Sequence, residues 1–203
     1  MASSVVALDP AKQERRRQIL AAAKTVFADS GYHGASIGAI IERAQIARGT
    51  FYLYFESKTA VFDSILDQAM KDLRARIRRI EVVEQTAAPP QVQLRAQVVA
   101  VFEYIVGDRP LAMLLLSAGH TPDVEAAERL DQFFGEIRDL LRRAVESGAE
   151  IGLLRKCHPE LVAAAMLGMI RGVIDLVIHD PSPPSVEVVV SEMLTVALRG
   201  VLA

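Results

Sequence analysis

Apolar residues recur at helical spacing along most of this chain, and no stretch alternates apolar and polar residues as a half-buried strand does. The first helix is expected from about residue 14 to about residue 29. Its apolar face consists of Ile19, Ala22, Ala23, Val26 and Phe27. Gly31 follows at a position where a left-handed residue commonly ends a helix. The pattern predicts an all-α protein.

Capping and helix-breaking residues divide the rest of the chain into further helices. Ser36 and Ser57 are suitable N-caps, and Gly148 is expected to close a long amphipathic helix. Proline-containing stretches at residues 88–90 and 181–184 should interrupt helices. The helices expected after the first are residues 36–44, 48–54, 57–83, 92–106, 111–118, 121–147, 159–178 and 185–200. The sequence therefore predicts about nine helices.

The composition is that of a soluble globular protein with an uneven distribution of charge. Hydrophobic residues make up 51% and charged residues 24% of the 203 positions. A mean hydropathy of +0.25 indicates more apolar surface than a small monomer needs to bury, which favours oligomerisation. Residues 11–58 contain eight basic and four acidic side chains, whereas residues 59–203 contain 15 basic and 20 acidic ones. This asymmetry suits an N-terminal polyanion-binding segment, although such a small excess is also common in proteins without one.

Several classes of protein find little support. Cys157 is alone, so neither an internal disulfide nor a multi-cysteine metal site is possible. The four histidines form no helical pair for a metal ion, and Cys157 with His158 lacks the other parts of a nucleophilic site. We therefore expect no enzyme, metal or cofactor. The start of the chain does not resemble a secretory signal, and the apolar run 161–170 is too short to span a bilayer. A cytoplasmic protein without a membrane partner is expected.

Residues 36–58 carry the most specific chemistry in the chain. Two short helices meet at a turn, and Phe51 and Phe55 lie four positions apart on the inward face of the second one. Arg48 can bind guanine edges or phosphate, and Gly49 would let DNA approach the backbone closely. Lys58 stands in the first turn of the next helix, where an external anion would offset its unfavourable position. The predicted DNA-contacting residues are Ser36, Arg48, Gly49, Thr50, Tyr52, Leu53, Tyr54 and Lys58.

This stretch resembles the N-terminal DNA-binding domain of TetR family transcriptional repressors. The resemblance runs from RQILAAAKTVFADSGYHGAS through IIERAQIARGTFYLYFESK to Val61, about a quarter of the chain. The residues at the family's spacing are Gly31, Ser36, Ala44, Gly49, Tyr52, Tyr54, Phe55 and Lys58. The chain departs from the family at Gln45, where a turn glycine is usual, and at Ala47, where a serine N-cap is usual.

The resemblance implies a helix-turn-helix domain at residues 1–58, with a flexible arm at residues 1–11, and a helical effector-binding and dimerisation domain at residues 59–203. It also implies a dimer on a palindromic operator of double-stranded DNA, released by a small and largely apolar effector. Candidate effector-pocket residues are Leu66, Met70, Phe102, Met113, Leu116, Phe134 and Met166. Candidate dimer-interface residues are Ala164, Gly168, Gly172, Val189 and Met193. Both sets could instead be ordinary core within one chain.

Two readings compete with a ligand-responsive repressor. An enzyme is disfavoured by the absence of a recognisable nucleophile, base or metal set. A helical ligand-binding or adaptor protein that has lost specific DNA binding is left open by Gln45 and Ala47. The intact set of Arg48, Thr50, Tyr52 and Lys58 favours the DNA-binding interpretation.

Overall fold

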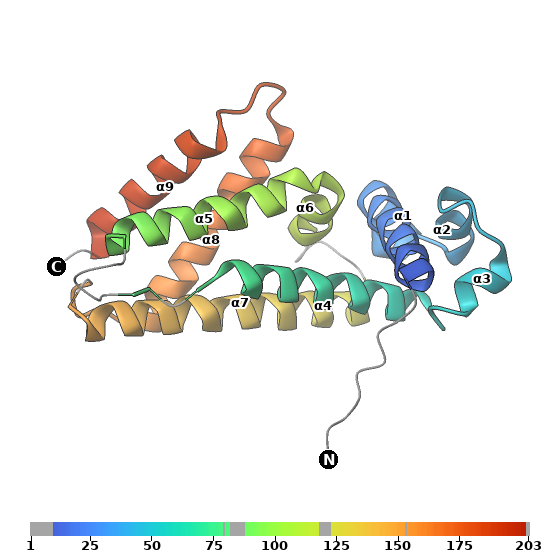
Figure 1. Ribbon diagram of the computed structural model, residues 1–203, viewed down its shortest axis with the longest axis horizontal. Coiled ribbons are helices and arrows are strands. Elements are labelled where there is room, and N and C mark those ends of the chain that lie inside the picture. The colour runs from blue at the N-terminus through green and yellow to red at the C-terminus, as the bar shows by residue number, and fades with distance from the viewer. Residues whose placement is uncertain (1–9, 79, 82–87, 118–122, 153, 202–203) are drawn as a thin grey trace, which may run out of the picture.

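The computed structural model describes residues 10–78, 80–81, 88–117, 123–152 and 154–201. Within these ranges the chain forms nine helices and no strand, which confirms the all-α prediction. The helices are α1 Pro10–Gly34, α2 Ile37–Arg43, α3 Arg48–Tyr52, α4 Lys58–Arg76, α5 Pro90–Gly107, α6 Arg109–Leu116, α7 Val124–Glu150, α8 Pro159–His179 and α9 Val186–Val201. Helices α1–α3 gather at one end of the molecule, and α4 runs from them into the body beside α7 (Figure 1).

The serine caps at the N-terminal end are formed as their chemistry favours, whereas the turn before α3 is formed without the residues that favour it. The Ser36 hydroxyl accepts a hydrogen bond from the backbone N–H of Ala39 at 3.1 Å, and Ser57 caps α4 in the same way. Gln45 has a φ of 50°, so the turn before α3 is left-handed without a glycine. Ala47 makes no side-chain capping bond to α3. Gly31 ends the regular part of α1 with a φ of 66°.

Several predicted helix boundaries are wrong, and the first helix begins at Pro10 instead of near residue 14. Helix α4 ends at Arg76 rather than near residue 83, because Ile77 is extended and the following segment bonds to side chains of α5. Helix α6 begins at Arg109, with Asp108 as its N-cap, instead of at residue 111. Helix α7 continues past Gly148 to Glu150, and Gly152 instead has the positive φ of 75°. The expected start at Thr121 and Pro122 lies outside the described residues, and α7 begins at Val124.

Gly148 has a packing role inside α7. A Cβ atom at this position would lie 2.7 Å from the side chain of Leu154, so the helix accepts the returning chain only because no side chain is present. Gly148 therefore allows another segment to pack closely and does not end the helix. Glycine permits close approach as readily as it permits a left-handed turn.

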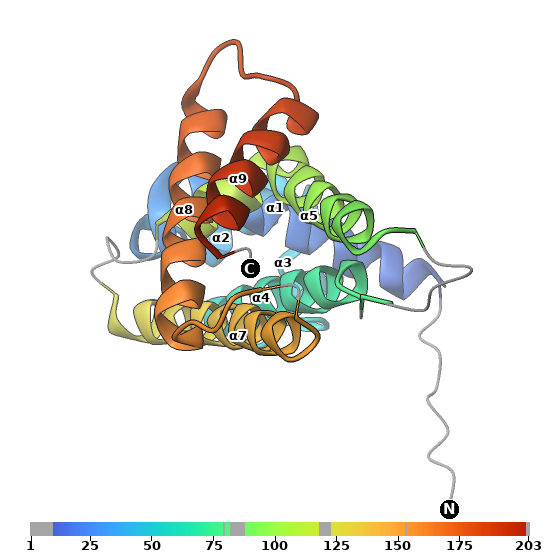
Figure 2. The same ribbon diagram turned by 90° about the vertical axis from the view of Figure 1, so that its left-hand side faces the viewer.

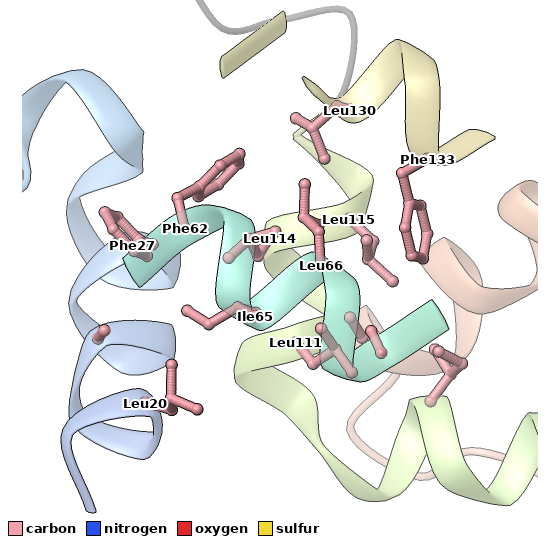
Figure 3. Close-up of a cluster of buried hydrophobic side chains, with 14 of the residues drawn as sticks. Leu20, Phe27, Phe62, Ile65, Leu66, Leu111, Leu114, Leu115, Leu130 and Phe133 are labelled. Atoms are coloured by element: carbon pink, nitrogen blue, oxygen red, sulfur yellow. The ribbon is translucent and has the colours of Figure 1, made fainter. Parts of the chain in front are cut away.

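One hydrophobic core runs through both ends of the molecule. Phe27 of α1, Phe62 and Leu66 of α4, Leu111 of α6 and Leu130 of α7 belong to the same buried cluster (Figure 3). The core is thus continuous across the domain boundary expected at residues 58 and 59. Helix α6 packs directly on α1, which gives the body a second contact with the N-terminal helices besides α4.

Helix α8 is strongly apolar, yet the chain buries only a small part of it. Its mean hydropathy reaches 2.1 over 18 residues, enough by length and composition to cross a membrane, as core helices of soluble proteins also are. Only 22% of that window is buried. In Figure 2, α8 rises from the level of α4 and α7, and α5 and α9 lie above that level beside it. Leu161 and Leu176 are exposed, so part of α8 faces away from the chain's own core.

Candidate nucleic-acid interface

Helix α3 presents a polar surface above a sealed core. Phe51 is fully buried and Phe55 nearly so, as predicted from their spacing. On the opposite side Tyr52 is 45% exposed and Leu53 82% exposed, and Arg48 is also exposed. The exposed backbone and side chains of this short helix are therefore accessible to a large partner such as a DNA groove.

Arg48 and Tyr52 lie together on the exposed face of α3, beside open backbone. The guanidinium of Arg48 lies 5.9 Å from the centroid of the Tyr52 ring, so these residues share a face. A Cβ atom added at Gly49 would meet nothing within 4 Å, which shows open space above the backbone there. Thr50 is half-buried. Tyr54 is half-buried and packs against the core, so it projects outward less than expected.

The ammonium group of Lys58 is hydrogen-bonded within the chain. Its ammonium group donates to the backbone carbonyls of Tyr32 at 2.7 Å and Ala35 at 3.2 Å, and lies 4.2 Å from the Tyr32 ring centroid. The partners of the Lys58 ammonium are therefore these two carbonyls, whereas the sequence predicts an external anion. Lys58 thus holds the start of α4 against the C-terminal end of α1 and the residue that follows it. The exposed Ser36 hydroxyl accepts from Ala39 and keeps its own proton for a further acceptor.

Sequence reasoning missed two polar contacts that hold this unit in place. Gln18 donates its amide to the carbonyl of Ala44 at 2.7 Å, which ties α1 to the turn before α3. Lys24 of α1 forms an ion pair with Asp108, the N-cap residue of α6. These partners are far apart in the sequence, and no local pattern signals them.

A hydrogen-bonded chain of side chains also joins α1, α4 and α7. The Tyr32 hydroxyl lies 2.9 Å from the Thr59 hydroxyl, which donates to Glu125 at 3.3 Å. Burial raises the pKa of Tyr32 above its ordinary value. Tyr32 therefore stays neutral and retains its phenolic proton for this network.

The candidate effector residues do not gather around one cavity. Leu66 and Met70 line an open groove of about 350 Å³ between α4 and α7, together with Phe133. The rim of the groove is charged, and Arg74 and Glu136 form an ion pair across it at 2.6 Å. Of the other five candidates, Phe102 is core, while Met113, Leu116, Phe134 and Met166 are half-buried away from the groove lining.

The candidate dimer residues divide into two groups. Ala164, Gly168 and Gly172 are exposed along one face of α8, as an interface stripe requires. Val189 and Met193 are only 8% and 6% exposed, because α9 packs this face against the chain's own α5. Their assignment to a dimer interface is wrong. The exposed apolar residues of α9 are instead Val188 and Val196.

Comparison with known proteins identifies two matching regions. Residues 19–65 match the model of bacterial regulatory proteins of the tetR family, and residues 87–175 match that of the tetracyclin repressor-like C-terminal domain. The HTH-type transcriptional activator FasR of Mycolicibacterium smegmatis is 28% identical over 76% of this chain and 70% of its own. The HTH-type transcriptional repressor DhaR of Mycobacterium sp. is 27% identical over 78% of this chain and 80% of its own.

A solved structure has the same fold over almost the whole chain. The transcriptional regulator FadR from Bacillus subtilis, in complex with stearoyl-CoA, superimposes with a TM-score of 0.75 and 20% identity, covering 91% of this chain and 98% of that one. The two matching family regions, which together span more than half of the chain, agree with the exposed α3 and the nine-helix fold. The chain belongs to the TetR family of helix-turn-helix transcriptional regulators.

Proposed function

We propose that this regulator binds a palindromic operator as a homodimer and releases it when a small, largely apolar effector binds the helical body. The observation that carries the proposal is the exposed face of α3, where Arg48, Gly49, Tyr52 and Leu53 point away from a sealed core. Arg48 supplies a base-edge or phosphate contact, and Tyr52 a hydroxyl for the backbone. Thr50, Tyr54 and Ser36 remain proposed contacts at the edges of this face.

The homodimer is supported by the exposed apolar face of α8. Leu161 and Leu176 are exposed there, and added Cβ atoms at Gly168 and Gly172 would meet nothing within 4 Å in this chain. A stripe of small residues between large apolar ones allows a second helix to pack closely and bury apolar area. A twofold dimer would place two α3 helices about 34–36 Å apart, one turn of DNA.

The effector proposal rests on the groove between α4 and α7. Leu66, Met70 and Phe133 form its apolar floor, and charged residues form its rim. The solved structure of FadR from Bacillus subtilis contains stearoyl-CoA, an apolar chain with a charged head. A ligand of this amphiphilic kind suits the groove chemically. Phe102, Met113, Leu116, Phe134 and Met166 remain candidates only for a site that opens when the helices move.

Release from DNA requires that the effector bind more tightly to an arrangement of heads that does not fit the operator. A coupling of about 1–3 kcal/mol would weaken operator binding roughly 5- to 150-fold. Helix α4 lines the groove at Leu66 and Met70, and its first residue, Lys58, is hydrogen-bonded to the C-terminal end of α1. Movement of α4 would therefore reach the head directly. We propose repression rather than activation. Of the two relatives named above, FasR is an activator and DhaR is a repressor.

A selection of bound sequences from a random pool of DNA duplexes tests the function. We expect a palindromic consensus, and Tyr52→Ala should lose affinity for it while the protein stays folded. Tyr52→Phe, which removes only the hydroxyl, should lose a similar part of the affinity, because the proposed phosphate contact is made by that hydroxyl. Enrichment of no sequence, together with binding to random DNA that does not depend on salt, would favour an adaptor that has lost DNA recognition.

A further inference from the structure

The positive charge of the N-terminal region is concentrated outside the helix-turn-helix. Residues 19–58 contain four basic and three acidic side chains, a net charge of only +1. Residues 12–18 contain four basic side chains and one acidic side chain, a net charge of +3. Most of the charge that could attract a polyanion therefore lies in the first turns of α1, ahead of the elements that read DNA.

Most cations of residues 19–58, all of which the structure describes, already have partners. Lys24 pairs with Asp108, and the ammonium of Lys58 donates to two carbonyls. Arg43 lies 3.7 Å from a carboxylate oxygen of Asp29, but both side chains are more than half exposed and such a pair is weak. Arg43 and Arg48 are therefore the cations of these residues that an external anion can reach. Two arginines per subunit are few for a protein whose affinity depends on phosphate neutralisation.

The basic segment is held against the DNA-reading unit. Arg15 donates to the Gln18 side chain at 2.7 Å, and Gln18 donates to the Ala44 carbonyl at 2.7 Å. This relay places the Arg15 guanidinium beside the turn that precedes α3. The guanidinium of Arg16 lies 5.3 Å from the centroid of the Phe55 ring, at the end of the α3 segment. Helix α1 lies beside α2 and α3 at the same end of the molecule (Figure 1).

The remaining side chains of the segment face solvent. Lys12 and Arg15 are exposed and have no acidic partner among the described residues. Arg17 pairs with Glu14 at 2.5 Å, but both side chains are about 70% exposed, and such pairs on a surface contribute little and exchange easily. These cations are thus available to an external anion.

We propose that the basic segment, Lys12, Arg15, Arg16 and Arg17, is a second DNA-contacting surface that binds backbone phosphates beside the groove read by α3. The inference rests on the proposed operator binding and assigns the sequence-independent part of the affinity to α1. Phosphate contacts fix the position of the protein on the duplex, whereas base contacts supply sequence preference. Gln18 acts as a positioning residue, because it aligns Arg15 with the α2–α3 turn.

The test is the salt dependence of binding by the full-length protein to a random duplex and to the selected operator. Each phosphate contact contributes about 0.9 to the slope of log K against log salt concentration. We expect Lys12→Gln combined with Arg15→Gln to lower the slope by about 1.8 per subunit on both duplexes. The preference for operator over random DNA should remain. Arg15→Lys should retain most of the slope, because it keeps the charge.

The matched control removes two exposed cations from the body that lie outside the groove lining, Arg138→Gln with Lys156→Gln, and should leave the slope unchanged. An unchanged slope in the α1 variant overturns the inference, and so does an equal decrease in the control, which would indicate only net charge. Failure of the proposed function looks different, because the unsubstituted protein would then show neither a preferred sequence nor a salt-dependent affinity. Circular dichroism confirms that both variants are folded.

Discussion

The two ends of the molecule leave different kinds of side chain exposed, and each kind indicates a partner. At α3, a guanidinium and a phenol stand above a core sealed by Phe51. At α8, glycines and leucines face outward, and less than a quarter of the most apolar window is buried. Polar groups with hydrogen-bonding capacity suit a phosphodiester polymer, whereas a contiguous apolar face suits another protein surface. The exposure of a side chain therefore indicates a partner only together with the polarity of that side chain.

The largest effect is expected from breaking the sealed core under α3. Phe51→Ala should lower the free energy of unfolding by about 3–5 kcal/mol, because it leaves a cavity among fully buried side chains. Tyr52→Ala, one residue away on the exposed side, should cost only about 1 kcal/mol, mainly through its lost edge-to-face contact with Phe51. Denaturant unfolding followed by circular dichroism measures both. Equal losses for the two variants would contradict the assignment of inward and outward faces.

The next effect concerns the exposed face of α8. Gly168→Glu should weaken the free energy of association of the proposed dimer by at least about 2 kcal/mol, because it places an unpaired charge in an apolar interface. The dissociation constant should rise roughly 30-fold. The chain itself has room for the side chain, so the monomer should fold. Analytical ultracentrifugation measures the change. Gly135→Glu in α7, where an added Cβ also meets no atom within 4 Å, is the control and should leave the dimer intact.

The smallest effect is expected where the two ends meet. Lys24 and Asp108 form a partly buried ion pair between α1 and the start of α6. Asp108→Asn removes the charge but keeps a good N-cap, and Lys24→Gln removes the other charge. A double-mutant cycle on unfolding free energies should give a coupling of up to about 1 kcal/mol. Additive effects of the two substitutions would show that the pair does not join head and body.

Helices and their faces followed from the sequence where local chemistry decides them. Helical periodicity placed Phe51 inward and Tyr52 outward, and the side chains of Ser36 and Ser57 cap the helices that they were expected to cap. Predictions were less accurate where a distant segment intervenes. Helix α4 stops at Arg76 because α5 offers side-chain partners to the segment after it. At Gly148 the helix continues, the side chain of Leu154 packs close to it, and the positive φ is at Gly152.

The sequence by itself determined the all-α fold, the caps of the DNA-reading unit and the composition of its outer face, since each depends on residues within a few positions of one another. Only the tertiary structure decided that Lys58 binds two carbonyls, that Val189 and Met193 are core, and which apolar residues border the α4–α7 groove. The physical reason is that the chemistry of a side chain, apolar or charged, fixes only the kind of partner with which it interacts favourably. Which partner it obtains depends on the helices that pack beside it.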